Sequence, residues 1–498
     1  MRPIVPLLVL APTLLSTSCL GGEPVPIIPD DSEATVETDI PDTGPEEPVE
    51  QEVPITDDWD ADDFYTVIDV GPDHDYASPC DIGWDALQGG TMVRIHWQEE
   101  PYRCKLAITT DAYENHPLVI MGVPDDEGRL PVISGIDAVT PDDMQYSNQD
   151  TWVVQIGGDS DDGVAAWVWL QDLAITGARA ENSFTAHDGT EMSYAANCAA
   201  LRISYGRNVH LYNLEISDSH TGLFVESSSE DVLLSSSWLH DNGHTGINSV
   251  QNAFIEAVNV TVEYNRMGAM VDGSRGTNLT DRSAGLTIRY NWFEGENPPV
   301  QLQSSNEAAI FEDPGYQSAM VYGNVFIAPV DQANSQLLTF GAGGDADATP
   351  RTGTLYFFHN TVVTERSDRT HLLLLPTADQ QAVFANNLVY APQEKHTVAV
   401  MSGDGQLTMN NNWLPERYQV QTSTSSGAVE EQSTTTGSEP GFIDYDNLDL
   451  HLEPDAPCQG LAGDADAGSA AHPVEYQYLL HQRRALRETT EDCGSYEG

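Results

Sequence analysis

The fold is decided by a pattern that occurs four times between residues 208 and 304. It reads NVHLYNLEISDSHTGLFVES at 208–227, DVLLSSSWLHDNGHTGINSV at 231–250, FIEAVNVTVEYNRMGAMVDG at 254–273 and GLTIRYNWFEGENPPVQLQS at 285–304. Each copy holds an alternating apolar run, a small polar residue, a second short apolar run, a polar turn with glycine and a third apolar run. Asn213, Ser236 and Asn259 are predicted to occupy equivalent places, 23 residues apart.

A period of this length, built from three short strands, predicts an all-β solenoid, the right-handed parallel β-helix. Each repeat forms one coil, and coils stack at the strand spacing of about 4.8 Å. The recurrent asparagine is expected to adopt the left-handed conformation of a tight turn and to bond its neighbours through stacked amides. A β-sandwich with asparagines in its turns is the alternative, which eight repeats disfavour. The series continues at wider spacings, and its alignment with the first three positions is fixed only to within one residue. Its further members are Asn291, Asn324, Asn360, Asn387 and Asn412.

The N-terminus has the features of an export signal followed by a tether. Residues 1–18 hold one basic residue and then an apolar run that is too short and too rich in proline for a membrane span. LLSTSC resembles a bacterial lipobox, with Ser16 where leucine is preferred, so Cys19 is the expected lipidation site. Ordinary cleavage, with Cys19 incidental, is the alternative. Residues 19–62 are acidic and poor in aromatic residues, which predicts a disordered tether on an outer-membrane or cell-surface lipoprotein.

The rest of the chain is expected to form the solenoid and its two caps. Residues 63–430 are assigned to the β-helix with an N-terminal cap, and residues 431–498 to a last coil and a closing cap. VEYQYLLHQRRALRE, at 474–488, is the one good helix candidate. Residues 176–196 are interpreted as an excursion from a coil, and 421–439 as a low-complexity loop.

Without Cys19, five cysteines remain. An exported chain meets an oxidising compartment, so we expect Cys80 to pair with Cys104 and Cys458 with Cys493. Cys198 lies in an apolar run and is interpreted as a buried hydrophobe, although its role stays open. The sequence shows no Cys/His metal spacing, so any metal ligands are unknown.

The formal net charge of −58 restricts the partners. Such a field excludes non-specific binding to nucleic acid and repels an acidic membrane surface, so the lipid anchor is the only expected membrane contact. The chain has two lysines, and this excess of carboxylates resembles proteins of saline habitats. A monomer is expected.

Basic residues gather at one place in this acidic chain. Arg266, Arg275, Arg282 and Arg289 lie within 24 residues, where the 20 Lys and Arg of the 498-residue chain would place about one. They are either part of a binding site or structural ion pairs with Asp272, Asp281 and Glu294.

The third apolar run of each repeat is predicted to present a polar outer face. His220, His244 and Arg266 are expected to stack in one column just before this run. Alternation then turns Leu223, Ile247, Ala269 and Val300 inward. The residues expected to face outward are Phe224, Glu226, Asn248, Met270, Asp272, Gln301 and Gln303. Carboxylates for hydroxyls or Ca²⁺, arginine for an acidic sugar and an aromatic ring for stacking would suit a polysaccharide.

Further motifs carry a family resemblance over about residues 64–498. GWDALQGGTMVRIHW, PYRCKLAI, NLTDRSAGLTIRYNWFEG, VYGNVFIAP and DCGSYEG are similar to a bacterial secreted branch of the pectin-lyase-like right-handed parallel β-helix superfamily. The resemblance implies recognition of a polysaccharide, with lyase or epimerase chemistry in many members. Relatives often carry lysine just before DRSAG, where this chain has Thr280. Arg282 remains, but guanidinium is a poor base, so His244 is the better proton acceptor.

The sequence therefore favours a surface lipoprotein that recognises an extracellular polysaccharide, and it leaves catalysis open. Its rival is a non-catalytic spacer or adhesin, because the fold alone fits both. No cofactor is required, and Ca²⁺ is an optional one. The candidate catalytic residues are His244, Arg266 and Arg282, and the candidate substrate contacts are His220, Phe224, Glu226, Asn248, Asp272, Arg275, Gln301 and Gln303.

The lipobox makes one prediction that needs no structure. Replacing Cys19 by serine removes the acylated thiol and should move the protein from the membrane fraction to the soluble fraction, as measured by fractionation and blotting. A Cys19→Ser protein that stays in the membrane fraction would show that acylation is not the anchor.

Overall fold

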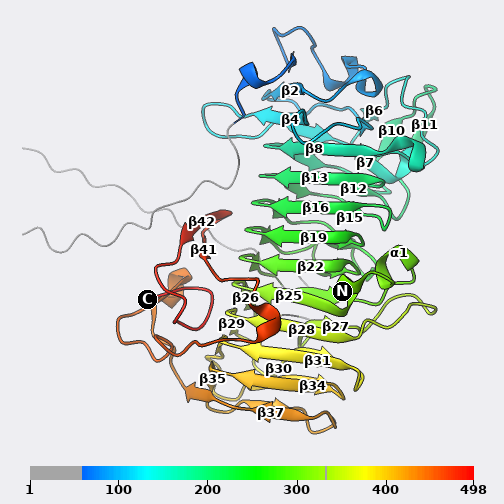
Figure 1. Ribbon diagram of the computed structural model, residues 1–498. Helices are drawn as coiled ribbons and strands as arrows, with labels where there is room; N and C mark the ends of the chain where they lie inside the picture. The colour runs from blue at the N-terminus through cyan, green and yellow to red at the C-terminus, as the bar shows by residue number, and fades with distance from the viewer. Residues whose placement is uncertain (1–58, 296, 331, 333) are drawn as a thin grey trace, which may run out of the picture. The chain divides into compact units, whose positions relative to one another are not determined.

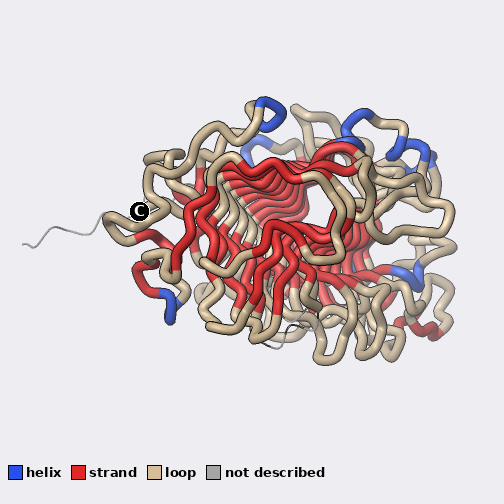
Figure 2. Tube along the Cα trace, turned by 90° about the horizontal axis from the view of Figure 1, so that it is seen from below, coloured by secondary structure: helices blue, strands red, loops and turns tan. Residues whose placement is uncertain are grey.

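Three long parallel sheets form the body of the protein, and successive strands of a coil belong to successive sheets (Figure 1). The structure is a computed structural model that describes residues 59–498 apart from 296, 331 and 333. The expected signal peptide, Cys19 and nearly all of the expected tether therefore lie outside the described residues. Along the axis, the strands of the three sheets superimpose around a common interior (Figure 2).

The sheets are numbered here in the order in which one coil visits them. Sheet 1 contains β1 (Thr66–Val70), β2 (Thr91–His96), β4 (Leu118–Val123), β8 (Ala165–Gln171), β13 (Gly206–Tyr212), β16 (Glu230–Ser235), β19 (Val258–Glu263), β22 (Ala284–Arg289), β25 (Ser318–Tyr322), β28 (Gly353–Phe358), β31 (Gln380–Ala385), β34 (Gln406–Asn410) and β37 (Val429–Glu431). Sheet 2 contains β5 (Val132–Ser134), β9 (Ala174–Thr176), β14 (Glu215–Ser217), β17 (Trp238–Leu239), β20 (Arg266–Met267), β23 (Trp292–Phe293), β26 (Val325–Ala328), β29 (Thr361–Thr364), β32 (Leu388–Tyr390), β35 (Asn412–Pro415) and β38 (Thr434–Gly437).

Sheet 3 carries the site described below. It contains β3 (Leu106–Ile108), β7 (Trp152–Ile156), β12 (Ala199–Ile203), β15 (Thr221–Val225), β18 (Gln251–Ile255), β21 (Thr277–Asp281), β24 (Val300–Leu302), β27 (Gln336–Phe340), β30 (Arg369–Leu375), β33 (Thr397–Gly403) and β36 (Gln419–Gln421). The predicted β fold is confirmed. The sheets extend to β37 and β38, so the expected low-complexity loop at 421–439 contributes two strands.

Few elements lie outside the three sheets. They are α1 (Ala308–Phe311), the strands β6 (Ala138–Val139), β10 (Ser183–Thr185), β11 (Glu191–Ser193), β39 (Phe442–Asp444), β40 (Asp449–Leu452), β41 (Tyr476–Leu479) and β42 (Arg483–Leu486), and the 3₁₀ helices η1 (Ala61–Asp63), η2 (Pro79–Asp81), η3 (Trp84–Ala86), η4 (Gln149–Thr151), η5 (Asp161–Gly163), η6 (Pro314–Gln317), η7 (Tyr445–Asn447) and η8 (Ala467–Ser469). In the described part of the chain, no helix has the length and apolar character to cross a membrane.

The interior consists of columns of apolar side chains that run from coil to coil. Strand alternation turns every second residue inward, and parallel pairing aligns equivalent residues. One column of sheet 1 contains Leu211, Leu234, Val262, Ile288, Val321, Phe357, Phe384 and Met409, all of them buried. Each of these residues packs on the one above and the one below, so the core is continuous along the solenoid.

A ladder of buried asparagines fills the corner between sheets 1 and 2. Asn324 shows the pattern: its Nδ2 donates to the carbonyl of Ile288 at 3.0 Å and to Oδ1 of Asn360 at 3.0 Å. Its own Oδ1 accepts from the backbone N–H of Asn291 at 2.9 Å. The ladder members with fully buried side chains are Asn265, Asn291, Asn324, Asn360, Asn387 and Asn412. The predicted ladder of stacked amides is therefore present.

The left-handed turn lies one residue before the ladder, which corrects the sequence register. Its residues have positive φ, and they are Asp172, Asn213, Ser236, Tyr264, Tyr290, Gly323, His359, Asn386 and Asn411. Asn213 and Ser236 were placed in the right row, but the residue that follows them is Tyr264, not Asn259. Asn259 belongs to a second left-handed row, at the start of the sheet 1 strands, with Asn208, Asp231 and Gly285. The ladder asparagines themselves do not have positive φ, so their role is hydrogen bonding.

The C-terminal segment corrects a second prediction. Residues 476–486 form an antiparallel hairpin of β41 and β42, not a helix. Tyr476 packs edge-on against Tyr264 and Tyr290, and Gln482 Nε2 donates to the carbonyl of Ser236 at 2.9 Å. Figure 1 shows the hairpin beside the middle strands, far from β37. The segment therefore does more than close the last coil, because it runs back along the corner and covers the tyrosines there.

Two disulfides are present, one at the N-terminal end of the solenoid and one in the C-terminal segment that packs beside sheet 2. Cys80 is bonded to Cys104, and Cys458 to Cys493, as the oxidising compartment led us to expect. Cys198 is a buried free thiol whose Sγ donates to the carbonyl of Ala178 at 3.1 Å. Burial raises the pKa of this thiol to about 12, so it stays protonated at neutral pH.

The corrected register makes a testable distinction between two adjacent residues. Asn412→Ala should lower the free energy of unfolding by about 2–3 kcal/mol, because the Asn387 amides and the Phe384 carbonyl lose a buried partner. Asn411→Gly keeps the left-handed turn and should cost well under about 1 kcal/mol. Thermal or denaturant unfolding of the two variants measures both costs, and equal costs would contradict the assignment.

Candidate functional site

Sheet 3 presents a row of aromatic and polar side chains on its outer face, half-buried except for the buried Thr280. Parallel register aligns one residue from each of five adjacent strands, β12, β15, β18, β21 and β24. In that order the residues are Arg202, Phe224, Phe254, Thr280 and Gln301. The rings of Phe224 and Phe254 stack with centroids 4.9 Å apart and planes 12° apart. They form a stacked apolar pair on a face that is otherwise polar.

A second row follows at the carboxyl edge of the same strands. It consists of Glu226, Glu256, Arg282 and Gln303, each two residues after a member of the first row. Arg202 Nη2 forms an ion pair with Glu226 Oε1, and the guanidinium lies 4.9 Å from the Phe224 ring centre. Arg282 lies 5.3 Å from the Phe254 ring centre. Each phenyl ring therefore has an arginine over it.

Arg282 is held in place by two oxygen partners. Its Nη1 donates to Asp345 Oδ2 at 2.9 Å, and its Nε and Nη2 both donate to Gln303 Oε1 at 3.3 Å. Asp345 comes from the loop at 341–352. We call the two rows together with Asp345 the sheet 3 strip.

Glu256 is the group in the strip best suited to proton transfer. It is 8% exposed, and burial raises the pKa of its carboxyl above the usual value, while the Ser305 hydroxyl and Arg282 act in the opposite direction. Ser305 Oγ donates to Glu256 Oε1 at 2.5 Å. A carboxyl with a raised pKa beside a polar surface is a candidate acid or base. The sequence analysis missed it, because it placed the strand at residues 246–250 and not at β18.

Beneath the strip, a carboxylate occupies a position that belongs to the core. Asp281 aligns with Ile255 and Leu302 in an inward column and is completely buried. Burial raises the pKa of Asp281 to about 6, against the opposing effects of Arg351 and Ser283. Its two oxygens accept from Ser283 N and Oγ, both at 2.8 Å. The DRS motif therefore turns Asp281 inward and Arg282 outward.

Arg351 is the buried counterion of this carboxylate. Its Nη2 lies 3.7 Å from Asp281 Oδ1, its Nε donates to the Gln303 carbonyl at 3.2 Å, and the side chain is fully buried. Arg351 ends the loop that carries Asp345. The buried Asp281–Arg351 pair therefore anchors this loop at the edge of the strip, where Asp345 lies beside Arg282.

The structure unites some of the predicted site residues and separates others. Phe224, Glu226, Arg282, Gln301 and Gln303 lie in the strip. Asn248 and Asp272 are exposed, as predicted, but do not lie on sheet 3. The predictions are wrong for Met270, which is buried, and for Ile247 and Ala269, which are exposed. These five residues, with Arg275, lie in the loops at 240–250 and 268–276, which lengthen two coils before β18 and β21 begin. The prediction failed because it used one constant turn length for all coils.

Arg266 is also outside the strip. It lies in β20 of sheet 2, where Nη2 pairs with Glu294 Oε1 at 2.7 Å and the guanidinium sits 4.9 Å from the Trp238 ring centre. Arg289 pairs with Glu263 at 2.6 Å on sheet 1. The arginine cluster of the sequence is thus divided among three faces, and Arg266 and Arg289 are structural ion pairs.

His220 and His244 lie close together at the other edge of sheet 3, where the chain enters strands β15 and β18. Their ring centroids are 5.2 Å apart. Their predicted column is therefore correct for the two histidines and wrong for Arg266. Glu181, which the sequence analysis did not single out, reaches both rings from the excursion at 176–196.

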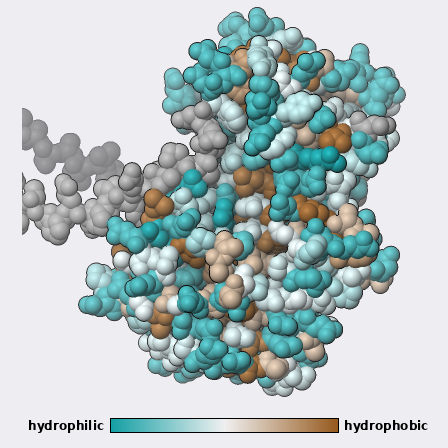
Figure 3. All heavy atoms as spheres, in the orientation of Figure 1, coloured by the Kyte–Doolittle hydropathy of each residue, from teal (hydrophilic) through white to brown (hydrophobic). Residues whose placement is uncertain are grey.

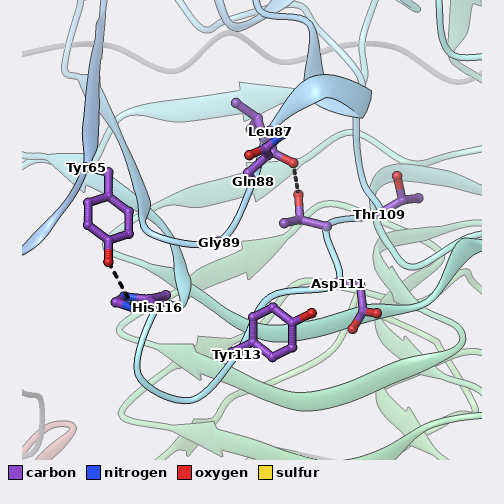
Figure 4. Close-up of a pocket in the computed structure, with 9 residues that line it drawn as sticks. Tyr65, Leu87, Gln88, Gly89, Thr109, Asp111, Tyr113 and His116 are labelled. Carbon is purple, nitrogen blue, oxygen red and sulfur yellow. Dashed lines mark hydrogen bonds between the residues drawn. The ribbon is translucent and has the colours of Figure 1, made fainter.

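A separate open pocket of about 420 Å³ lies at the N-terminal end of the solenoid. Figure 4 shows Tyr65, Tyr113 and His116 around it, with Tyr65 Oη 3.0 Å from His116 Nε2. Thr109 and Asp111 follow β3, the first strand of sheet 3, so this pocket lies at the same edge as Glu226 and Arg282. From β3 to β24 this edge spans six strand spacings, or about 29 Å.

Comparison with known sequences agrees with this architecture. Residues 180–310 match the family described as the right handed beta helix region. The chain is a right-handed parallel β-helix. No curated protein sequence matches it.

Solved structures similar to this β-helix include three carbohydrate-active proteins. An alginate lyase from Paenibacillus sp. str. FPU-7 is 10% identical over 74% of this chain and 99% of its own, with a TM-score of 0.40. A PL6 family polysaccharide lyase from Pseudopedobacter saltans is 9% identical over 77% and 96%, with a TM-score of 0.44. A GH136 lacto-N-biosidase from Eubacterium ramulus is 10% identical over 74% and 68%, with a TM-score of 0.38. Similarity this distant does not extend to chemistry, so function is argued from the site.

The buried pair beneath the strip makes a prediction about stability. Asp281→Leu should lower the free energy of unfolding by about 3–5 kcal/mol, because Arg351 would keep a buried charge without its counterion. Adding Arg351→Met should recover most of that loss, since the column around Asp281 is apolar. Denaturant unfolding of both variants measures the difference. A double variant as unstable as the single one would show that the charge pair is not the relevant interaction.

Proposed function

We propose that this protein binds an extracellular polysaccharide along the sheet 3 strip, at the cell surface to which lipidated Cys19 would attach it. The observation that carries the proposal is the partly exposed stacked pair of Phe224 and Phe254, with an arginine beside each ring. A sugar ring has an apolar face of C–H groups and an edge of hydroxyls. An exposed aromatic pair bordered by carboxylates, amides and guanidinium groups offers contacts for both parts.

The exposure of this stacked pair distinguishes it from the tyrosine row at the corner between sheets 1 and 2. Phe224 and Phe254 stay partly exposed. Tyr264 and Tyr290, in contrast, are each 1% exposed, because β41 lies against them. An inert spacer has no need to leave a stacked phenyl pair in water, where its burial would be favourable. This contrast supports recognition over the spacer or adhesin alternative.

The charges of the strip favour a neutral, hydroxyl-rich polymer over a polyuronate. Both arginines are already paired with carboxylates, Arg202 with Glu226 and Arg282 with Asp345. The chain as a whole carries a formal charge of −58 and would repel an anionic polymer. Paired carboxylates and guanidinium groups still accept and donate hydrogen bonds to hydroxyls.

Processing of the bound polymer is a second candidate function, and Glu256 is the observation that favours it. The raised pKa of its carboxyl would let it hold a proton closer to neutral pH than an ordinary glutamate. Of the catalytic residues expected from the sequence, Arg266 lies on sheet 2, Arg282 is hydrogen-bonded to Asp345 and Gln303, and His244 lies at the opposite edge of sheet 3 from Glu256. Glu256 therefore replaces them as the first residue to test.

Binding to a panel of neutral and acidic polysaccharides, at low and high salt, tests the proposal. Phe254→Ala should weaken binding of a retained polymer about tenfold or more, the equivalent of about 1.4 kcal/mol or more. His210→Ala is the matched control: this ring faces outward on sheet 1 and stacks on Trp169 at 4.1 Å, so its loss should leave binding unchanged. A wild-type protein that retains none of the polymers would refute the function.

Product analysis separates binding from processing. If the polymer is cleaved, new reducing ends or unsaturated products should form with the wild type, and Glu256→Gln should reduce them about a hundredfold or more while binding persists. A bound polymer that stays intact would leave recognition as the whole function.

A further inference from the structure

Three electron-pair donors converge at the entry edge of sheet 3, outside the strip. They are the Nε2 atoms of His220 and His244 and the carboxylate of Glu181. Glu181 Oε1 lies 3.1 Å from His244 Nε2, and Glu181 Oε2 lies 3.6 Å from His220 Nε2. The three residues come from three separate turns, so the fold and not local sequence brings them together.

Both histidines are oriented with Nε2 toward the shared space. His220 Nδ1 lies 3.1 Å from the Ala196 carbonyl, and His244 Nδ1 lies 3.0 Å from the Thr245 carbonyl. A carbonyl oxygen only accepts, so in each neutral ring the proton is on Nδ1 and the lone pair is on Nε2. A backbone carbonyl behind the ring is the usual support of a metal-binding imidazole.

His220 provides an independent sign of a missing partner. Its side chain is 6% exposed, and its Nε2 is buried without a hydrogen-bond partner in the described part of the chain. Two lone pairs and a carboxylate that face one another repel unless a positive charge lies between them.

The spacing fits a small divalent ion. Zinc binds imidazole nitrogen and carboxylate oxygen at about 2.0–2.2 Å, so two ligands of a tetrahedral ion lie about 3.4 Å apart. The two measured separations fall on either side of this value, and all three ligand atoms lie within 4.8 Å of one another. Imidazole nitrogen suits zinc and related transition metals, whereas Ca²⁺ requires oxygen ligands.

Arg179 holds the surrounding loops together. Its Nη1 donates to the Gly243 carbonyl at 2.9 Å, and its Nη2 donates to the Asp241 carbonyl at 3.0 Å. It thereby ties the loop of Glu181 to the loop of His244. The ligands are positioned by the protein itself, which lowers the ordering cost of binding an ion.

From this geometry we propose that Glu181, His220 and His244 form a binding site for a divalent transition metal of the zinc class. Three protein ligands leave coordination positions open for water or an oxygen of another molecule. Glu181 is 58% exposed, so these positions are reachable from solvent. The site does not depend on the polysaccharide proposal.

A second cluster in the structure serves as the control. Asp69, His74 and His96 also bring three possible ligands together. There, however, Asp69 Oδ2 already accepts a hydrogen bond from Arg94 Nη2 at 2.7 Å. Asp69 Oδ1 is also hydrogen-bonded to His96 Nε2 at 2.7 Å. The guanidinium supplies the positive charge and would repel a metal ion, so we assign no metal to this cluster.

Metal binding to the full mature chain, made without a polyhistidine tag and stripped with a chelator, tests the proposal. Equilibrium dialysis with elemental analysis should find about one tightly bound Zn²⁺ per chain, and Co²⁺ at the same site should give a visible absorption band that Zn²⁺ abolishes. His244→Ala should weaken the affinity about a hundredfold or more, and Glu181→Gln about tenfold or more. Both residues are partly exposed in loops, so both variants should keep the wild-type melting temperature in metal-free buffer.

His96→Ala is the matched control and should bind the metal as the wild type does. Three outcomes would overturn the proposal: no stoichiometric Zn²⁺ or Co²⁺ at micromolar concentrations, an affinity unchanged by His244→Ala, or an equal loss in His96→Ala. Tight binding of Ca²⁺ in place of Zn²⁺ would also contradict it.

Discussion

The fold depends on a hydrogen-bonded ladder at one corner of the coil. A parallel solenoid must turn its backbone sharply between sheets 1 and 2, and a turn buried against the next coil leaves amide and carbonyl groups without water. The asparagines from Asn265 to Asn412 satisfy these groups. Each side chain donates to a carbonyl of the preceding coil and accepts a backbone N–H there. Because a lost partner in this position costs about 1–3 kcal/mol, the ladder allows little variation.

Because the geometry of this corner is the same in every coil, the other two turns of the coil can vary in length. The interval between successive ladder positions ranges from 23 residues at Leu214–Ser237 to 36 at Asn324–Asn360, yet the strands of sheet 3 stay in register. The extra residues form loops at the two edges of sheet 3. These loops carry Glu181, His244, Asp345 and Arg351. The sheet thus supplies the aligned rows of side chains, and the loops supply the charged partners. On the face visible in Figure 3, hydrophilic side chains predominate at both ends and apolar ones gather near the middle.

The sequence predicts the repeat, the parallel strands and the amide ladder, because each follows from periodicity. It also predicts Phe224 and Gln301 on the outer face of sheet 3, since β15 and β24 begin where the analysis placed them. It does not predict the register at Asn259, because the interval from Ser237 to Asn265 is 28 residues and not 23. Asn248 and Asp272 were misplaced for the same reason.

Glu181 and Glu256 were missed for different physical reasons. Glu181 belongs to a loop without periodicity, and only the three-dimensional fold brings it to His220 and His244. Glu256 follows a strand that the sequence analysis placed several residues too early. Asp281 carried a usable signal, because a charged residue at the end of the TNLTD strand interrupts an otherwise apolar inward column. A core position occupied by a carboxylate requires a buried partner, which Arg351 provides 70 residues later.

The central claim is that this β-helix binds a polysaccharide on the outer face of sheet 3. Hydrogen–deuterium exchange, with and without a polysaccharide that the protein retains, tests it most directly. The account predicts slower exchange at the turns after β15 and β18 and in the loop at 341–352, with no change in the β41–β42 hairpin. Slower exchange confined to sheet 1 or to the C-terminal segment, with sheet 3 unaffected, would contradict it.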